Sequence, residues 1–187
     1  MKEDTPTRTY KTKDGREVTL RAPRWSDLDN LLNFVNSLVE EGVEIGCNKK
    51  ITRAYEAEYL AKSLIELGKD KKIAIVAEVG SKFAGQLEVQ FPSGAARHVG
   101  SLVISLKQNY RGLGIGTEMM KEAEVQSRRL GLKLITLEVF ATNQGAIRLY
   151  KRLGYDIVGK IPKGFLKDNQ YIDKIIMVKD LYENARK

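Results

Sequence analysis

The chain has 187 residues, of which 42% are hydrophobic and 30% charged, and this composition is typical of one soluble globular domain. Its single cysteine, Cys47, excludes an intramolecular disulfide framework, and no apolar run has the length of a membrane-spanning helix. The polar start of the sequence lacks the apolar stretch of a secretory signal, so we expect a cytoplasmic protein, and the net charge of +8 favours anionic partners.

The first third of the chain is predicted to form an arm, a strand and two helices. Residues 1–15 have the polar character of a flexible arm, ahead of a single domain at 16–187. Alternating polar and apolar residues predict a strand at 17–21. Apolar residues at helical spacing and closing glycines then predict two helices, one from Ser26, a good N-cap, to Gly42 and one from Thr52 to Leu67.

The middle of the chain is predicted to be an antiparallel meander, because three strand-like runs follow one another with short turns between them. These runs lie at 73–79, 83–91 and 98–106. A glycine turn then opens a helix that ends near Leu130. The remaining elements are predicted as a strand at 134–140, a helix at 146–153 and strands at 155–161 and 171–178. The fold class is therefore mixed α/β (α+β).

The segment Arg111–Gly116 carries three alternating glycines where the long helix begins. A helix N-terminus presents unpaired N–H groups and a partial positive charge, and glycines let an anion approach the backbone, so this pattern predicts a phosphate cradle. Arg111 adds a possible charge-assisted contact. A plain tight turn stays open as an alternative, as does a dinucleotide fingerprint, which would lack its third glycine. A Walker loop is excluded, because Thr117-Glu118 stands where Lys-Ser/Thr is required.

The same segment matches a family motif. Its pattern Arg-x-x-Gly-x-Gly resembles the Gln/Arg-x-x-Gly-x-Gly/Ala cofactor motif of the GNAT superfamily of N-acetyltransferases. Residues 143–155, with Asn-x-x-Ala, then Leu-Tyr, then Gly-Tyr, resemble the second motif of the family. The resemblance covers about residues 16–181. It implies a single GNAT-like domain with a central mixed, mostly antiparallel sheet of about seven strands, whose middle strands splay apart, and about four flanking helices.

The resemblance also implies acetyl-CoA as co-substrate, without a metal, between the strands at 98–106 and 134–140. The pantetheine arm would run along the first strand as an added strand does, and the pyrophosphate would lie on the glycine turn. Asn143 would lie near the pantetheine, although an asparagine there also suits the N-cap of the next helix. The implied cofactor-binding residues are Val103, Ile104, Ser105, Arg111, Gly112, Leu113, Gly114, Ile115, Gly116, Thr117, Asn143 and Tyr150.

In this family an amine attacks the thioester directly, so the reaction needs a base and an acid. Tyr150 matches the tyrosine that protonates the departing thiolate, and its alternative is a half-buried core aromatic. Glu138 is the first candidate base, because its Leu-Glu-Val string resembles ribosomal-protein N-terminal acetyltransferases; an ion pair with a neighbouring lysine is the alternative. Glu88 and His98 are further candidates, from strand alternation and from the pKa of imidazole. Cys47 is not expected to act as a nucleophile.

The acceptor is predicted to be a protein or peptide amine, above all an N-terminal α-amine, and the alternatives are a polyamine, an amino acid or an aminoglycoside. It would enter past 40–51 and a loop at 162–169, where Glu40, Glu41 and Glu44 would attract a cation unless they form only a solvated helix end. A non-catalytic acyl-CoA-binding module is a further alternative. Nucleic-acid and membrane partners are not expected, and monomer and homodimer both stay open.

Overall fold

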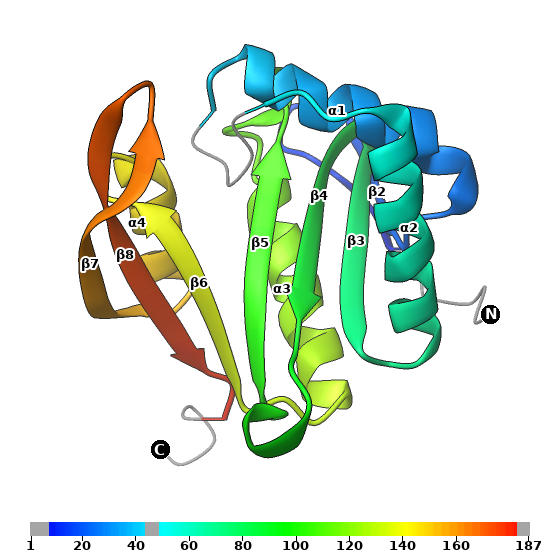
Figure 1. Ribbon diagram of the computed structural model, residues 1–187. Helices are drawn as coiled ribbons and strands as arrows, with labels where there is room; N and C mark the ends of the chain where they lie inside the picture. Colours follow the sequence, from blue (N-terminus) through cyan, green and yellow to red (C-terminus); the bar gives the residue numbers. More distant parts are fainter. Residues whose placement is uncertain (1–7, 44–48, 183–187) are drawn as a thin grey trace. The chain divides into compact units, whose positions relative to one another are not determined.

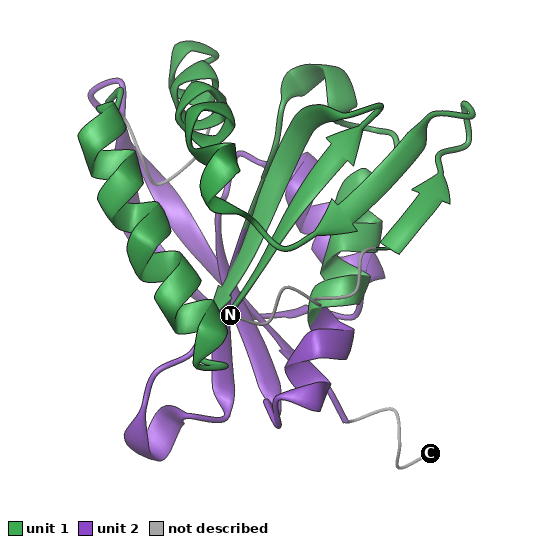
Figure 2. Cartoon of the chain, turned by 90° about the vertical axis from the view of Figure 1, so that its right-hand side faces the viewer, with its two compact units in different colours: residues 1–89, 104–123 green, residues 90–103, 124–187 purple. Residues whose placement is uncertain are grey.

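The computed structural model describes residues 8–43 and 49–182. The chain divides into two compact units (Figure 2). Unit 1 comprises residues 1–89 and 104–123, and unit 2 comprises residues 90–103 and 124–187. Strand β5 (Val99–Leu106) and helix α3 (Ile115–Arg129) each have residues in both units.

Unit 1 is built on a run of neighbouring strands. Strand β1 (Arg8–Lys11) pairs antiparallel with β2 (Glu17–Arg21), and β2 pairs antiparallel with β3 (Lys72–Val79). Strand β4 (Lys82–Gln90) is the next neighbour, followed by β5. Residues 8–11 therefore form a strand where the sequence predicted a flexible arm.

The turn between β1 and β2 explains that difference. Gly15 adopts a φ of 85°, which favours glycine, and its N–H donates to the carbonyl of Thr12 at 3.0 Å. The Thr12 hydroxyl accepts the N–H of Arg16 at 3.1 Å, and the Thr12 N–H donates to the Arg16 carbonyl at 2.9 Å. The Asp14-Gly15 pair is a hairpin signal in the sequence.

Two helices cover one face of β3 and β4. Helices α1 (Leu28–Glu40) and α2 (Arg53–Gly68) contribute to one buried apolar cluster with both strands. The cluster consists of Leu28, Leu31, Phe34, Leu38, Leu60, Val76 and Phe83. Burying these side chains provides most of the free energy that holds the helices on the sheet. Thr52, predicted as the start of this helix, is the N-cap of α2, since its hydroxyl accepts the N–H of Tyr55 at 3.3 Å.

The start of α1 differs from the prediction. A 3-10 turn, Trp25–Asp27, precedes the helix, and Asp27 rather than Ser26 occupies the N-cap. The Asp27 carboxylate accepts the N–H of Arg24 at 2.7 Å and two bonds from the buried Arg21 guanidinium, each at 2.7 Å. A charged acceptor with a bidentate partner is a stronger anchor than a serine hydroxyl.

Strand β4 approaches the end of β5 closely at Gly85. A Cβ at this position would overlap the Leu106 side chain and lie 2.5 Å from the carbonyl oxygen of Ser105, so only glycine fits. Immediately beyond β5, the N–H of Lys107 donates to the carbonyl of Ala84 at 2.9 Å. These contacts fix the point at which the chain leaves β5 for the glycine turn.

Unit 2 contains strands in the order β5-β6-β8-β7 (Figure 1). Strand β6 (Leu134–Phe140) is parallel to β5 and antiparallel to β8 (Gln170–Asp180), and β8 is antiparallel to β7 (Asp156–Lys167). Helix α4 (Gln144–Arg152) connects β6 to β7. Because β5 belongs to both units, the eight strands form one mixed sheet, and the predicted fold class is confirmed with one strand more than the sequence suggested.

The prediction of a loop at 162–169 is wrong. Strand β7 continues to Lys167, and Asp168 and Asn169 form a tight turn with φ values of 48° and 62°. Asp and Asn tolerate this left-handed conformation better than other non-glycine residues, so the pair was an available turn signal. Within residues 8–43 and 49–182, no helix has the length and apolar character needed to cross a membrane.

Candidate functional site

The glycine turn of unit 1 connects β5 to α3. A short 3-10 turn, Gln108–Tyr110, leads into Gly112 and Gly114, whose φ values are 77° and 82°. A Cβ built on either glycine would meet nothing within 4 Å, so the outer face of the turn is open. Helix α3 begins at Ile115, which is buried and anchors the first helical turn. The positive φ values therefore favour glycine here, and the absence of side chains leaves the backbone of the turn accessible.

The backbone amides of this turn have no backbone acceptor within the described part of the chain. Among the described residues, no backbone hydrogen bond takes an N–H group of residues 112–117; the next amide, that of Glu118, donates to the Gly114 carbonyl at 3.2 Å. The first N–H groups of a helix have no partner within the helix and carry the positive end of its dipole. The turn can therefore bind an anion of phosphate size through its backbone.

The charged side chains around the turn are paired with one another. Lys121 and Arg8 each contact Glu118 at 2.8 Å and hold the pKa of its carboxyl below the usual range, so that its negative charge is compensated beside the turn. Arg111 donates from Nε to the carbonyl of Leu106 at 2.9 Å and pairs with Glu41 at 2.8 Å. The Arg111 side chain thus braces the turn.

Two acidic residues at the C-terminal end of α1, Glu40 and Glu41, are also ion-paired. Glu41 holds Arg111, and Glu40 pairs with Lys50 at 2.5 Å with both side chains largely exposed. Glu44 and Cys47 lie outside the described residues. The paired carboxylates are therefore partly neutralised by the chain itself.

In unit 2, the pairing of β5 with β6 ends before either strand does. The last pair is Leu102 with Leu137, whereas β6 continues to pair with β8 as far as Phe140 and Lys174. Glu138 is thus the first β6 residue past the β5 pairing, and the next β5 residue, Val103, is 65% exposed. Beyond Leu102, the backbone N–H and C=O groups on this edge of β5 therefore do not pair with β6.

Tyr150 lies on α4 and is 8% exposed. Burial raises its pKa to about 12, so the phenol is protonated at neutral pH. Its ring lies 6.2 Å from the ring of Tyr155, which is more deeply buried and whose hydroxyl has no partner in the described part of the chain. Asn143 caps this helix, since its Oδ1 accepts the N–H of Ala146 at 3.1 Å. The N-cap interpretation of Asn143 is confirmed.

Glu138 is 51% exposed and forms an ion pair with Lys174 on β8, at 2.6 Å. The structure therefore contains the alternative expected for this glutamate, an ion pair with a neighbouring lysine. The carboxylate nevertheless keeps half of its surface open to solvent or to a ligand.

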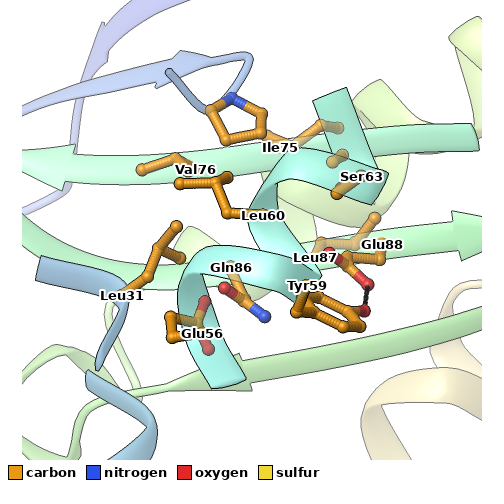
Figure 3. Close-up of a pocket in the computed structure, with 12 residues that line it drawn as sticks. Leu31, Glu56, Tyr59, Leu60, Ser63, Ile75, Val76, Gln86, Leu87 and Glu88 are labelled. Atoms are coloured by element: carbon orange, nitrogen blue, oxygen red, sulfur yellow. Dashed lines mark hydrogen bonds between the residues drawn. The ribbon is translucent and has the colours of Figure 1, made fainter. Parts of the chain in front are cut away.

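Glu88 is placed in the interior of unit 1, beside α2 (Figure 3). Its carboxylate contacts Lys72 Nζ at 2.9 Å and accepts a hydrogen bond from the Tyr59 hydroxyl at 2.5 Å. Glu88, Tyr59 and Glu56 border a cavity of about 10 Å³, room for one water molecule. Phe83, also on β4, packs against Phe34 of α1 and so faces the same helical layer as Glu88. Residues five positions apart on a regular strand face opposite sides of the sheet, so the alternation along β4 is interrupted between these two residues.

Glu56 is a buried acid that the sequence analysis did not single out. It is 4% exposed, and burial, followed by repulsion from Glu88, raises its pKa to about 7; attraction to Lys72 opposes the shift. A charged residue on the inward face of an amphipathic helix was the only signal in the sequence.

His98 is exposed and precedes the N-terminal end of β5, whereas the glycine turn follows the C-terminal end. Its carbonyl accepts the N–H groups of Lys133 and Leu134, at 2.8 and 3.2 Å. Its backbone therefore holds the starts of β5 and β6 together.

The model of the acetyltransferase (GNAT) family matches residues 34–155. The chain belongs to this family. The GNAT resemblance, the mixed α/β fold and the acyltransferase class predicted from the sequence are thereby confirmed. Within residues 8–43 and 49–182, this GNAT protein has no group of three or more His, Cys, Asp or Glu that could hold a metal ion.

Individual relatives differ in how much of this GNAT chain they match. The L-amino acid N-acetyltransferase AaaT of Escherichia coli is 28% identical over 107 residues, 56% of this chain and 66% of its own length. An N-alpha-acetyltransferase of Sulfurisphaera tokodaii is 24% identical over 168 residues, 84% of this chain and 91% of its own. The structure of yncA from Salmonella typhimurium, solved with its cofactor acetyl-CoA, superposes with a TM-score of 0.78 at 19% identity, covering 90% of this chain and 96% of yncA.

Proposed function

We propose that this chain transfers the acetyl group of acetyl-CoA directly to a primary α-amine, first of all the N-terminal amine of a protein or peptide. The observation that carries the proposal is the run of amides at 112–117, which have no backbone acceptor among residues 8–43 and 49–182, beside two glycines with open space around them. A pyrophosphate needs several N–H donors and no side chain in the way, and the amides and open glycines of this turn support that role.

Further groups on β5 suit the rest of the co-substrate. The pantetheine arm contains two amides and can pair with an unused strand edge. In the proposal it pairs with the backbone of Val103, Ile104 and Ser105, and the exposure of Val103 is consistent with a ligand on that strand. Asn143 contributes through its cap, which sets the start of α4 and hence the position of Tyr150.

The chemistry requires two proton transfers. Glu138 takes a proton from the acceptor amine, which attacks the thioester carbonyl and forms the amide bond as the C–S bond breaks. Tyr150 donates a hydrogen bond, and then its proton, to the departing thiolate. Because burial raises the pKa of Tyr150, the phenol is always protonated but is a weak acid, so its hydrogen bond to the developing charge supplies most of its effect. Glu88 and His98 do not enter the proposal, because one is ion-paired inside unit 1 and the other precedes β5.

The relatives support an α-amine. The S. tokodaii protein, which matches most of both chains, is named an N-alpha-acetyltransferase, and this favours a polypeptide acceptor. The E. coli relative is named for L-amino acids, and this favours the second candidate, a free amino acid. Both candidate acceptors carry an α-amine. In a polypeptide the α-carbon is attached to a peptide carbonyl, and in a free amino acid it is attached to a carboxylate.

One experiment separates the candidates. The protein is incubated with acetyl-CoA and, in separate reactions, a lysine-free peptide with a free N-terminus, an N-terminally blocked peptide containing lysine, free amino acids and a polyamine. Thiol release gives the rate, and mass spectrometry locates the acetyl group. We expect the free N-terminus to be acetylated fastest; exclusive acetylation of free amino acids would shift the assignment to the second candidate, and no thiol release with any amine would refute transfer.

A further inference from the structure

Lys174 lies at the centre of a cluster of side chains on one face of unit 2. It stands opposite Phe140 in the β6–β8 register, and its Nζ lies 2.6 Å from Oε2 of Glu138. The same ammonium lies 4.8 Å from the centroid of the Phe165 ring. Only 19% of the Lys174 side chain is exposed, compared with 51% for Glu138. The lysine therefore has contacts on two sides, whereas Lys174 is the only ion-pair partner of Glu138 within residues 8–43 and 49–182.

An irregularity in β7 brings Phe165 to this position. The β7–β8 register passes from Ile161 opposite Lys174 to Phe165 opposite Ile172, which leaves residues 162–164 against the single residue Asp173. Lys163 adopts a φ of 58°, and its N–H donates to Asp173 Oδ1 at 2.9 Å. Such bulges re-aim the side chain that follows them.

The re-aimed ring is fixed in turn. Phe165 stacks on Phe140 with centroids 3.8 Å apart and planes 8° from parallel. At Gly164 a Cβ would lie 2.6 Å from the Cβ of Lys174, so the absent side chain leaves the room that Lys174 occupies. The bulge, the glycine and the stacked rings together leave the ammonium little freedom to move.

We propose that Lys174 is a positioning residue that holds the Glu138 carboxylate in the one orientation in which it accepts the proton of the acceptor amine. This inference rests on the proposed role of Glu138 as the base. An exposed ion pair contributes little to stability, so stability alone does not account for the arrangement around Lys174. A half-exposed glutamate without a fixed partner samples several rotamers, and a misplaced catalytic group lowers the rate steeply.

The strand offers a matched control. Lys179 also lies on β8, pairs with Glu124 at 2.6 Å and lies 5.7 Å from the Tyr155 ring centroid. An odd number of positions separates it from Lys174, so it points to the opposite face of the strand. Lys179→Met therefore removes one ion pair and one aromatic contact, as Lys174→Met does, but on the face of the sheet that does not carry Glu138. The carboxylate that loses its partner, Glu124, is more buried than Glu138.

The test compares Lys174→Met, Lys174→Arg, Lys179→Met and Glu138→Gln, together with the double variant Lys174→Met/Glu138→Gln. Turnover and KM are measured with the best acceptor, and the melting temperature is recorded for each protein. We expect Lys174→Met to lower kcat about tenfold with little change in KM for acetyl-CoA, and Lys174→Arg to restore most of the loss. Lys179→Met should lower the melting temperature at least as much and leave kcat within about twofold.

The double variant decides whether Lys174 acts through Glu138. If it does, Lys174→Met causes no further loss in the Glu138→Gln background, because residues that act as a unit are not additive. The same fold-loss in both backgrounds, or an equal loss of kcat in Lys179→Met, would overturn the positioning role. Full activity of Glu138→Gln would instead remove Glu138 as the base. A large loss in Glu138→Gln with none in Lys174→Met would overturn this inference alone.

Discussion

Replacing Glu56 with glutamine should remove a pH dependence of folding stability that this one carboxyl creates. Glu56 is 4% exposed and faces Glu88 from β4 and Lys72 from β3, with Tyr59 and Ser63 nearby on its own helix. Burial and the charge of Glu88 raise its pKa from the usual 4.5 to about 7. In the folded protein the group therefore keeps its proton over a range in which the unfolded chain has lost it.

The sign and size follow from linkage. Between pH 4.5 and 7 the folded state binds more protons at Glu56 than the unfolded state does, so the free energy of unfolding falls as pH rises through this window. The stabilising contribution is complete below pH 4.5 and lost above pH 7. At 1.36 kcal/mol for each pH unit, the loss amounts to roughly 3 kcal/mol, a large part of the stability of an ordinary domain. Glutamine mimics the protonated acid and cannot ionise.

The assay is urea denaturation of the wild type and Glu56→Gln at a series of pH values from 4.5 to 8, followed by circular dichroism. The stability of the variant relative to the wild type should increase by roughly 3 kcal/mol across the series, and Glu58→Gln, on the exposed side of α2, serves as the matched control. Two curves that stay parallel over the whole range would refute the reasoning, because they would show that Glu56 ionises equally easily in both states.

Three further predictions concern single residues. Tyr150→Phe should lower kcat by about two orders of magnitude while leaving the affinity for acetyl-CoA unchanged, as measured by steady-state kinetics and calorimetry; a turnover equal to wild type would remove Tyr150 from the mechanism. Gly85→Ala should destabilise the protein by about 1–3 kcal/mol in urea, since its Cβ collides with Leu106 and Ser105, and an unchanged midpoint would contradict that close approach. Asn143→Ala should cost about 1 kcal/mol through the lost cap of α4, and Asn143→Ser should recover most of it; equal stability of all three proteins would rule the cap out as a stabilising contact.

Much of the fold could be predicted from the sequence because its patterns are local. Helix α2 begins at Arg53, one residue after its predicted start, Thr52, and β6 has the predicted bounds, Leu134–Phe140. The misses occurred where local signals were short or unusual. The Asp14-Gly15 and Asp168-Asn169 turns create hairpins that the hydrophobic pattern did not reveal, and the bulge at 162–164 disrupts alternation along β7.

The part of the candidate site that backbone groups form could be predicted from the sequence. The glycine turn follows from glycine spacing at a helix start, and no backbone acceptor among the described residues takes its amides. Side-chain partners could not be predicted, because they join residues far apart in the sequence. Arg111 meets Glu41, Glu88 meets Lys72, and Lys174 meets Glu138 only once the strands and helices have packed. No periodicity in a single segment carries that information.

The most direct test of the account is calorimetric titration of acetyl-CoA into the wild type, Gly114→Glu and Gly131→Glu. Gly131 follows the other end of α3 with a φ of 81° and open space around its Cβ position, so the control carries the same backbone strain and the same new charge. We predict that the wild type and Gly131→Glu bind acetyl-CoA alike, and that Gly114→Glu binds at least tenfold more weakly because its side chain enters the amide cradle. Equal affinity in all three proteins would contradict the glycine turn as the site of the pyrophosphate.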